Sequence, residues 1–120
     1  MSYDKNPLAD KSYAFALQIV KVYKFIINDK KEYVISKQLL RSGTSIGANI
    51  AEANGAISTA DFSAKISIAY KESLETKYWL RLLKDADYLI EPRAQELIEN
   101  ADELSRIMFA ILKNTRIKKN

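Results

Sequence analysis

One stretch of small residues, from Arg41 to Ala53, constrains the fold of this chain more than any other. Its sequence, RSGTSIGANIAEA, has helical character, yet it holds two glycines and few bulky side chains. A glycine inside a helix costs about 1 kcal/mol relative to alanine. The stretch therefore predicts a helix whose face at Gly43, Gly47 and Ala51 lies close to a neighbouring helix.

Apolar residues at three- and four-residue spacing flank this stretch on both sides, which is typical of amphipathic helices. Asn6 followed by Pro7, and Ser58 three residues before Asp61, are typical helix starts. Helices are expected over about residues 7–28, 33–54 and 59–87 and from Pro92 onward. Because the connections are short, the chain is predicted to form one domain over residues 1–120, an all-α antiparallel up-down-up-down four-helix bundle.

The first helix has a wider apolar face than one core contact needs. Beside its main stripe lies a second one, formed by Tyr13, Leu17, Val20 and Ile27. A face of this width indicates burial on two sides, inside the protomer and against another copy of the chain.

Composition removes many classes of chemistry. The chain has no histidine and no cysteine, which excludes a Ser-His-Asp site, a thiolate nucleophile and the usual zinc and haem ligands. We therefore expect neither an enzyme nor a bound cofactor. With no apolar run of about 20 residues and no secretion signal, we expect no membrane span and a cytoplasmic location.

Two sets of polar residues interrupt otherwise apolar helices. Ser42, Ser45, Asn49 and Glu52 form a polar stripe on the second helix, and Glu72 and Glu75 share a face of the third. One interpretation is that the stripe meets these two glutamates in a network that fixes the helix register. The residues assigned to this structural motif are Arg41, Ser42, Gly43, Gly47, Asn49, Glu52, Glu72, Glu75 and Trp79.

A second interpretation gives the glutamates a catalytic role. The pairs Glu72 with Glu75 and Glu99 with Asp102 have the spacing that all-helical nucleotide pyrophosphohydrolases use to hold magnesium or manganese. A metal-dependent nucleotide hydrolase that uses Glu72 and Glu75 is therefore an alternative. Glutamate-rich helices also produce such pairs by chance.

Two motifs in combination carry a resemblance over nearly the whole chain. The segments LLRSGTSIGANIAEA (39–53) and AYKESLETKYWL (69–80) resemble the bacterial four helix bundle protein family, whose first members are encoded in intervening sequences of large-subunit ribosomal RNA genes. The resemblance implies an antiparallel four-helix bundle that assembles as a ring-like homopentamer. A related branch, the accessory proteins of diversity-generating retroelements, is a basic pentamer that binds nucleic acid.

The charge distribution is compatible with a nucleic-acid partner. Net charge is +4, and it is +4 over residues 1–41, −2 over residues 42–91 and +2 over residues 92–120. The leading hypothesis is RNA binding by basic residues repeated around an oligomeric ring. A protein-interaction scaffold without nucleic acid is a further alternative. The candidate contact residues are Lys21, Lys24, Lys30, Lys31, Lys37, Lys113, Arg116, Lys118 and Lys119.

Overall fold

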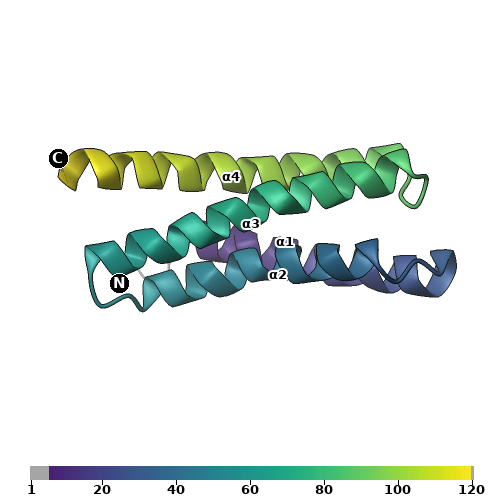
Figure 1. Cartoon of the computed structure of the whole chain (residues 1–120), viewed down its shortest axis with the longest axis horizontal. Helices are drawn as coiled ribbons and strands as arrows, with labels where there is room; N and C mark the ends of the chain where they lie inside the picture. The colour runs from purple at the N-terminus through teal and green to yellow at the C-terminus, as the bar shows by residue number, and fades with distance from the viewer. Residues whose placement is uncertain (1–5, 120) are drawn as a thin grey trace.

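Four long helices form the structure, a computed structural model that describes residues 6–119, with side chains as far as Thr115. The elements are α1 (Pro7–Phe25), a π-helical turn η2 (Ile26–Lys30), α2 (Ile35–Asn54), α3 (Thr59–Asp85) and α4 (Glu91–Lys119). Consecutive helices run in opposite directions, and no strand occurs within residues 6–119 (Figure 1). The predicted all-α, up-down-up-down four-helix bundle is confirmed.

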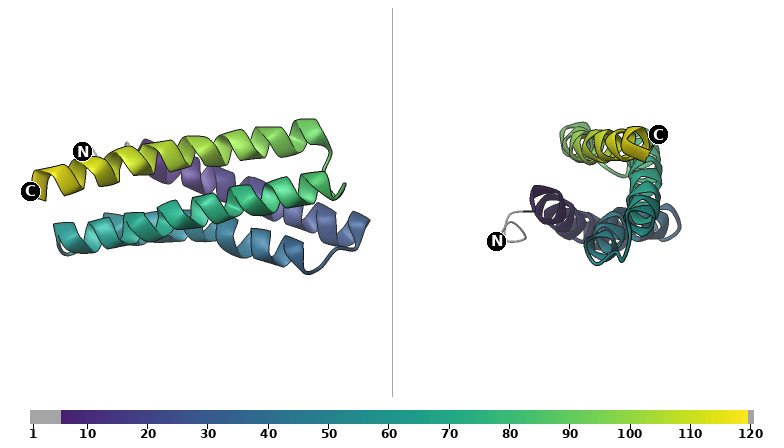
Figure 2. Two further views of the ribbon diagram at one scale, coloured as in Figure 1. Left: turned by 45° about the horizontal axis from the view of Figure 1, so that its top comes forward. Right: turned by 90° about the vertical axis from the view of Figure 1, so that its left-hand side faces the viewer.

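The helices are arranged as an open arc rather than a closed square. Viewed end-on, they follow one another in chain order, with α1 and α4 at the two ends of the arc (Figure 2). Side-chain pairs nevertheless join these two ends. The Lys11 ammonium lies 3.2 Å from a carboxylate oxygen of Glu103, and the Asn100 amide donates to Gln18 at 3.2 Å.

The core consists of the apolar stripes that face the inside of the arc. On α1 these are Phe15, Ile19 and Val22, and the stripe continues into η2 at Ile26, as the spacing predicts. The matching stripe on α4 contains Leu97, Ala101, Leu104 and Met108, all fully or almost fully buried. Burial of this kind stabilises the fold by about 25 cal/mol for each Å² of apolar surface removed from water.

Local capping explains where the helices begin. The Asn6 side chain accepts a hydrogen bond from the backbone of Ala9 at 3.0 Å, and Pro7 occupies the first helical position. At α3, the Ser58 hydroxyl accepts from the backbone of Asp61 at 3.0 Å. In a reciprocal capping box the aspartate accepts from the capping residue itself, whereas here it accepts from Ile57 at 3.3 Å.

The start of α2 differs from the sequence expectation. The helix begins at Ile35, two residues later than expected, because Glu32 caps it from outside. The Glu32 carboxylate accepts from the backbone amides of Val34, Ile35 and Ser36 at 3.0, 2.8 and 2.7 Å. Burial raises the pKa of Glu32, but these three amides outweigh it, so the pKa lies below its usual range.

Two non-glycine residues take the left-handed backbone conformation at one end of the bundle. Lys31 has φ 56° and Asp87 has φ 67°, and they follow η2 and α3 respectively. Because the backbone of Asp87 is left-handed, α3 ends at Asp85, two residues earlier than the sequence predicts.

No helix within residues 6–119 is long and apolar enough to cross a membrane.

Candidate functional site

The two glycines of α2 lie against α1. A Cβ atom on Gly43 would be 2.9 Å from two side-chain carbons of Ile19, which is closer than real Cβ atoms approach. A Cβ atom on Gly47 would be 3.4 Å from the carbonyl oxygen of Ser12, an ordinary contact distance. Only Gly43 is therefore required by close packing. Ala51 is exposed, so its assignment to the close-packing face was wrong.

The polar stripe of α2 does not meet the glutamates of α3 as expected. The Ser42 hydroxyl accepts from Thr76 of α3 at 2.9 Å, while the Asn49 amide donates within its own helix to Ser45. Glu52 pairs with Lys65 at 2.8 Å, and the hydrogen bond that Lys65 donates to Glu52 raises the pKa of this lysine. The stripe turns around the helix, so its members face different neighbours.

Arg41 is the residue that joins α2 to the two glutamates. Its guanidinium donates to Glu72 at 3.3 Å and also to Glu75, whose second hydrogen bond comes from the Trp79 indole at 2.9 Å. The Glu72 side chain is only 20% exposed, whereas Arg41 is half exposed. The cluster therefore links α2 to α3 by hydrogen bonds and ion pairs at the edge of the core.

This arrangement does not favour the metal-dependent alternative. Arg41 occupies the carboxylates of Glu72 and Glu75, and within residues 6–115 no three acidic side chains are grouped to hold a metal ion. In the second pair, the hydrogen bond from Lys77, followed by that from Arg106, lowers the pKa of Asp102. Glu99 is exposed and accepts from Gln95 at 3.3 Å.

The candidate lysines fall into two separate groups. The first five lie at the end of the bundle where α1 and η2 lead into α2, and all five are exposed. None of them forms an ion pair with any residue between 6 and 115. This group, called the basic end below, consists of Lys21, Lys24, Lys30, Lys31 and Lys37.

The remaining candidates lie toward the other end. Lys113 is exposed on the last turns of α4, at the opposite end of the bundle (Figure 1). The side chains of Arg116, Lys118 and Lys119 lie outside the described residues. The structure therefore does not bring all the predicted basic residues together on one protomer.

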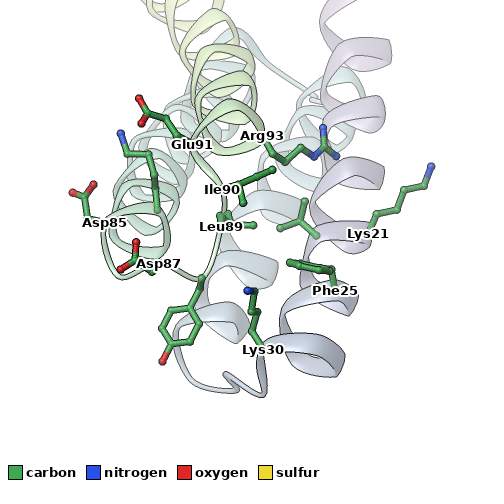
Figure 3. Close-up of a pocket in the computed structure, with 12 residues that line it drawn as sticks. Lys21, Phe25, Lys30, Asp85, Asp87, Leu89, Ile90, Glu91 and Arg93 are labelled. Atoms are coloured by element: carbon green, nitrogen blue, oxygen red, sulfur yellow. The ribbon is translucent and has the colours of Figure 1, made fainter.

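A cavity of about 860 Å³ opens at the basic end. It lies between the last turns of α1 and η2 on one side and the α3–α4 connection on the other (Figure 3). Its apolar wall contains Val22, Phe25, Leu89 and Ile90. Cavities of roughly 300–1,000 Å³ with mainly apolar walls and a few polar groups are typical of ligand sites.

Charged groups are distributed unevenly around this cavity. Lys30 extends from η2 into it, and Arg93 reaches from α4 toward α1 across it (Figure 3). Asp85, Asp87 and Glu91 also belong to its lining, and the carboxylates of Asp85 and Glu91 point outward (Figure 3). Lys30 and Arg93 are therefore the two cationic side chains that extend toward a cavity whose lining also includes the acidic Asp87.

Sequence reasoning missed two of these residues, Phe25 and Arg93. The Lys30 ammonium lies 6.0 Å from the centre of the Phe25 ring, and the two residues are five apart. A search at the α-helical spacings of three and four does not pair them, but the π-helical turn does. Arg93 follows Pro92 at the start of α4, and its only visible signal was its position beside a helix start.

The fold and this surface define a small all-α bundle protein with no recognised catalytic constellation among the described residues. The model of the 23S rRNA-intervening sequence protein family matches residues 4–110, and the chain belongs to that family.

One solved structure is similar over most of its length, with a TM-score of 0.87 and 48% sequence identity. It is a protein of unknown function from the S23 ribosomal protein family of Bacteroides thetaiotaomicron. The alignment covers 88% of this chain and 98% of that one. No curated protein matches the chain significantly. Neither description names an enzymatic activity.

Proposed function

We propose that this protein is an RNA-binding module that acts as a homo-oligomeric ring, a homopentamer as its family resemblance implies. The observation that carries the proposal is the basic end, where five exposed lysines have no carboxylate partner among residues 6–115. Unpaired lysines are free to displace counterions from a phosphate backbone.

Assembly would multiply this weak charge. Each chain carries a net charge of +4, so five copies would carry about +20. A phosphate chain that contacts several copies gains avidity without any new type of contact. The ring is therefore the form in which a modest basic patch is sufficient for binding.

An exposed apolar strip on α1 supports self-association. Tyr13 is 68% exposed and Leu17, one turn later, is also exposed. Exposed neighbouring apolar side chains of this kind mark interaction surfaces. They belong to the second stripe that the sequence assigns to a neighbouring copy.

Light scattering on the purified protein tests the assembly. The unmodified chain should give the mass of a pentamer, and Tyr13→Lys with Leu17→Lys should give a smaller species. Ile57→Lys is the matched control, because Ile57 is an exposed apolar residue in the connection between α2 and α3. A stable monomer at micromolar concentration for the unmodified chain would refute the assembly.

Filter binding with a single-stranded RNA over a salt series tests the partner. We expect log K to fall linearly with log salt, because bound lysines release counterions. Replacing Lys24, Lys31 and Lys37 by glutamine should reduce this slope by about 2, at roughly 0.7 per lost phosphate contact.

The matched control removes the same charge elsewhere, with glutamine at Lys11, Lys65 and Lys71, and should leave most of the slope intact. If the unmodified protein shows no affinity at low salt, RNA is not its partner. A protein-interaction scaffold is then the function to test next.

A further inference from the structure

We propose that the cavity at the basic end binds one unpaired nucleotide of the RNA, with its base against Phe25 and its phosphate at Lys30 and Arg93. This inference rests on the proposed function, and it adds a specific site to a general electrostatic attraction. The proposed occupant of the cavity is one nucleotide within a single-stranded segment of RNA.

The first argument is the placement of an aromatic ring. Phe25 is 43% exposed, and its ring forms part of the cavity wall rather than of the core (Figure 3). Single-stranded nucleic acids are held by aromatic rings on which bases stack, and every base offers such a face. The remaining wall, from Val22 and Leu89, is apolar and suits the other surfaces of a flat ring.

The second argument is the sign of the charge beside this ring. The Lys30 ammonium lies over the Phe25 ring, 6.0 Å from its centre, so an anion held by this ammonium is close to a base that contacts the ring. The Arg93 guanidinium uses one nitrogen on Glu96 at 2.6 Å. Its other N–H groups remain available for phosphate, which a guanidinium binds in a bidentate manner.

The third argument is that a nucleotide supplies both a flat ring and an anionic group at once. An isolated phosphate would leave the apolar wall exposed to water, and an uncharged aromatic molecule would leave the Lys30 ammonium without an anionic partner. The volume of about 860 Å³ is large enough for a nucleotide. A base inside a duplex has both faces covered by its neighbours, so the base that enters must be unpaired.

Fluorescence anisotropy with a labelled unstructured RNA and with a hairpin of the same length tests the proposal. Phe25→Leu keeps an apolar side chain of similar size but removes the stacking ring. We expect this variant to bind the unstructured RNA about tenfold more weakly, with an unchanged salt slope and an unchanged affinity for the hairpin. Arg93→Gln should weaken the same complex and lower its salt slope by roughly 0.7.

Phe109→Leu is the control, since Phe109 is 54% exposed on α4 and packs against Tyr70 rather than in the cavity. It should bind both RNAs like the unmodified protein. Thermal melting of all variants tests that each is folded.

A second measurement uses NMR to follow the methyl resonances of Leu89 and Ile90 as adenosine 5′-monophosphate is added. These resonances should shift in the unmodified protein but not in Phe25→Leu.

The outcomes separate this inference from the proposed function. If RNA binds with a salt slope but Phe25→Leu and Phe109→Leu bind alike, the nucleotide site is refuted and the general RNA-binding function stands. If no RNA binds at low salt, the proposed function fails, and the inference about an RNA nucleotide fails with it. Methyl shifts on adding the mononucleotide would then identify the cavity as a site for free nucleotides, which is a different function.

Discussion

The contact between Gly43 and Ile19 gives the sharpest prediction about stability. In Gly43→Ala, the new methyl group would lie 2.9 Å from two carbons of Ile19, which is completely buried. Carbon atoms prefer about 3.5–4.0 Å, so Ile19 has to move by roughly 0.6–1 Å inside a packed core. Overpacking of this kind costs about 1–3 kcal/mol.

The same substitution also brings a gain. Alanine is favoured over glycine in a helix by about 1 kcal/mol, so the net loss for Gly43→Ala is about 1 kcal/mol. Gly47→Ala has the same gain, but its methyl group meets Ser12 only at 3.4 Å. This second variant should be as stable as the unmodified protein or more stable by up to about 1 kcal/mol.

Urea unfolding followed by circular dichroism measures both variants, at one protein concentration because assembly would add to stability. The expected difference of about 1–2 kcal/mol between the two variants corresponds to roughly 4–10 °C in Tm. In an Ile19→Ala background, which removes the clashing carbons, Gly43→Ala should become stabilising. Equal stability changes at the two glycines, or no change of sign in that background, would refute the packing argument.

Three further predictions concern polar groups. Glu32→Ala should cost about 1 kcal/mol at neutral pH. Because folding lowers the pKa of Glu32, its stabilisation is present above the unfolded pKa of about 4.3 and is lost as the pH falls through the folded pKa, so urea titrations should show the two proteins converging in acid. Arg41→Gln should cost about 1 kcal/mol because its ion pairs are partly exposed, and it should shift the fluorescence of Trp79, which shares a glutamate with Arg41. Ser73→Ala and Ser105→Ala each break a buried hydroxyl pair at 2.7 Å, so a double-mutant cycle should show that together they cost less than their sum by about 0.5–1 kcal/mol.

The fold was predictable because its determinants are local. The three- and four-residue spacing of apolar side chains fixes where helices occur, and Asn6 with Pro7 or Ser58 fixes where two of them begin. The start of α2 was placed two residues too early because its cap, Glu32, lies outside the helix and binds three amides at once. Glutamate is not one of the usual capping residues, so its role is not apparent from the sequence.

The partners of polar residues were less predictable than the helices. Spacing shows that residues of one helix share a face, but it does not show which neighbour that face meets. Arg41 and Ser42 do reach α3, whereas Asn49 binds back to its own helix. A stripe with steps of three, four and three residues drifts around a helix of 3.6 residues per turn, so one stripe can meet several environments.

The cavity could not be predicted because it depends on departures from regular helix geometry. Had α1 continued as an α-helix, residues five apart would not have shared a face, and Lys30 would have been turned away from Phe25. The π-helical turn and the left-handed conformation of Lys31 prevent this, and on the opposite side Asp87 ends α3 in the same conformation. A non-glycine residue with positive φ is unfavourable, so two of them at one end of the bundle represent a cost that surrounding contacts have to offset. Such costs concentrate at functional sites, which is an argument, independent of charge, for testing this end of the bundle first.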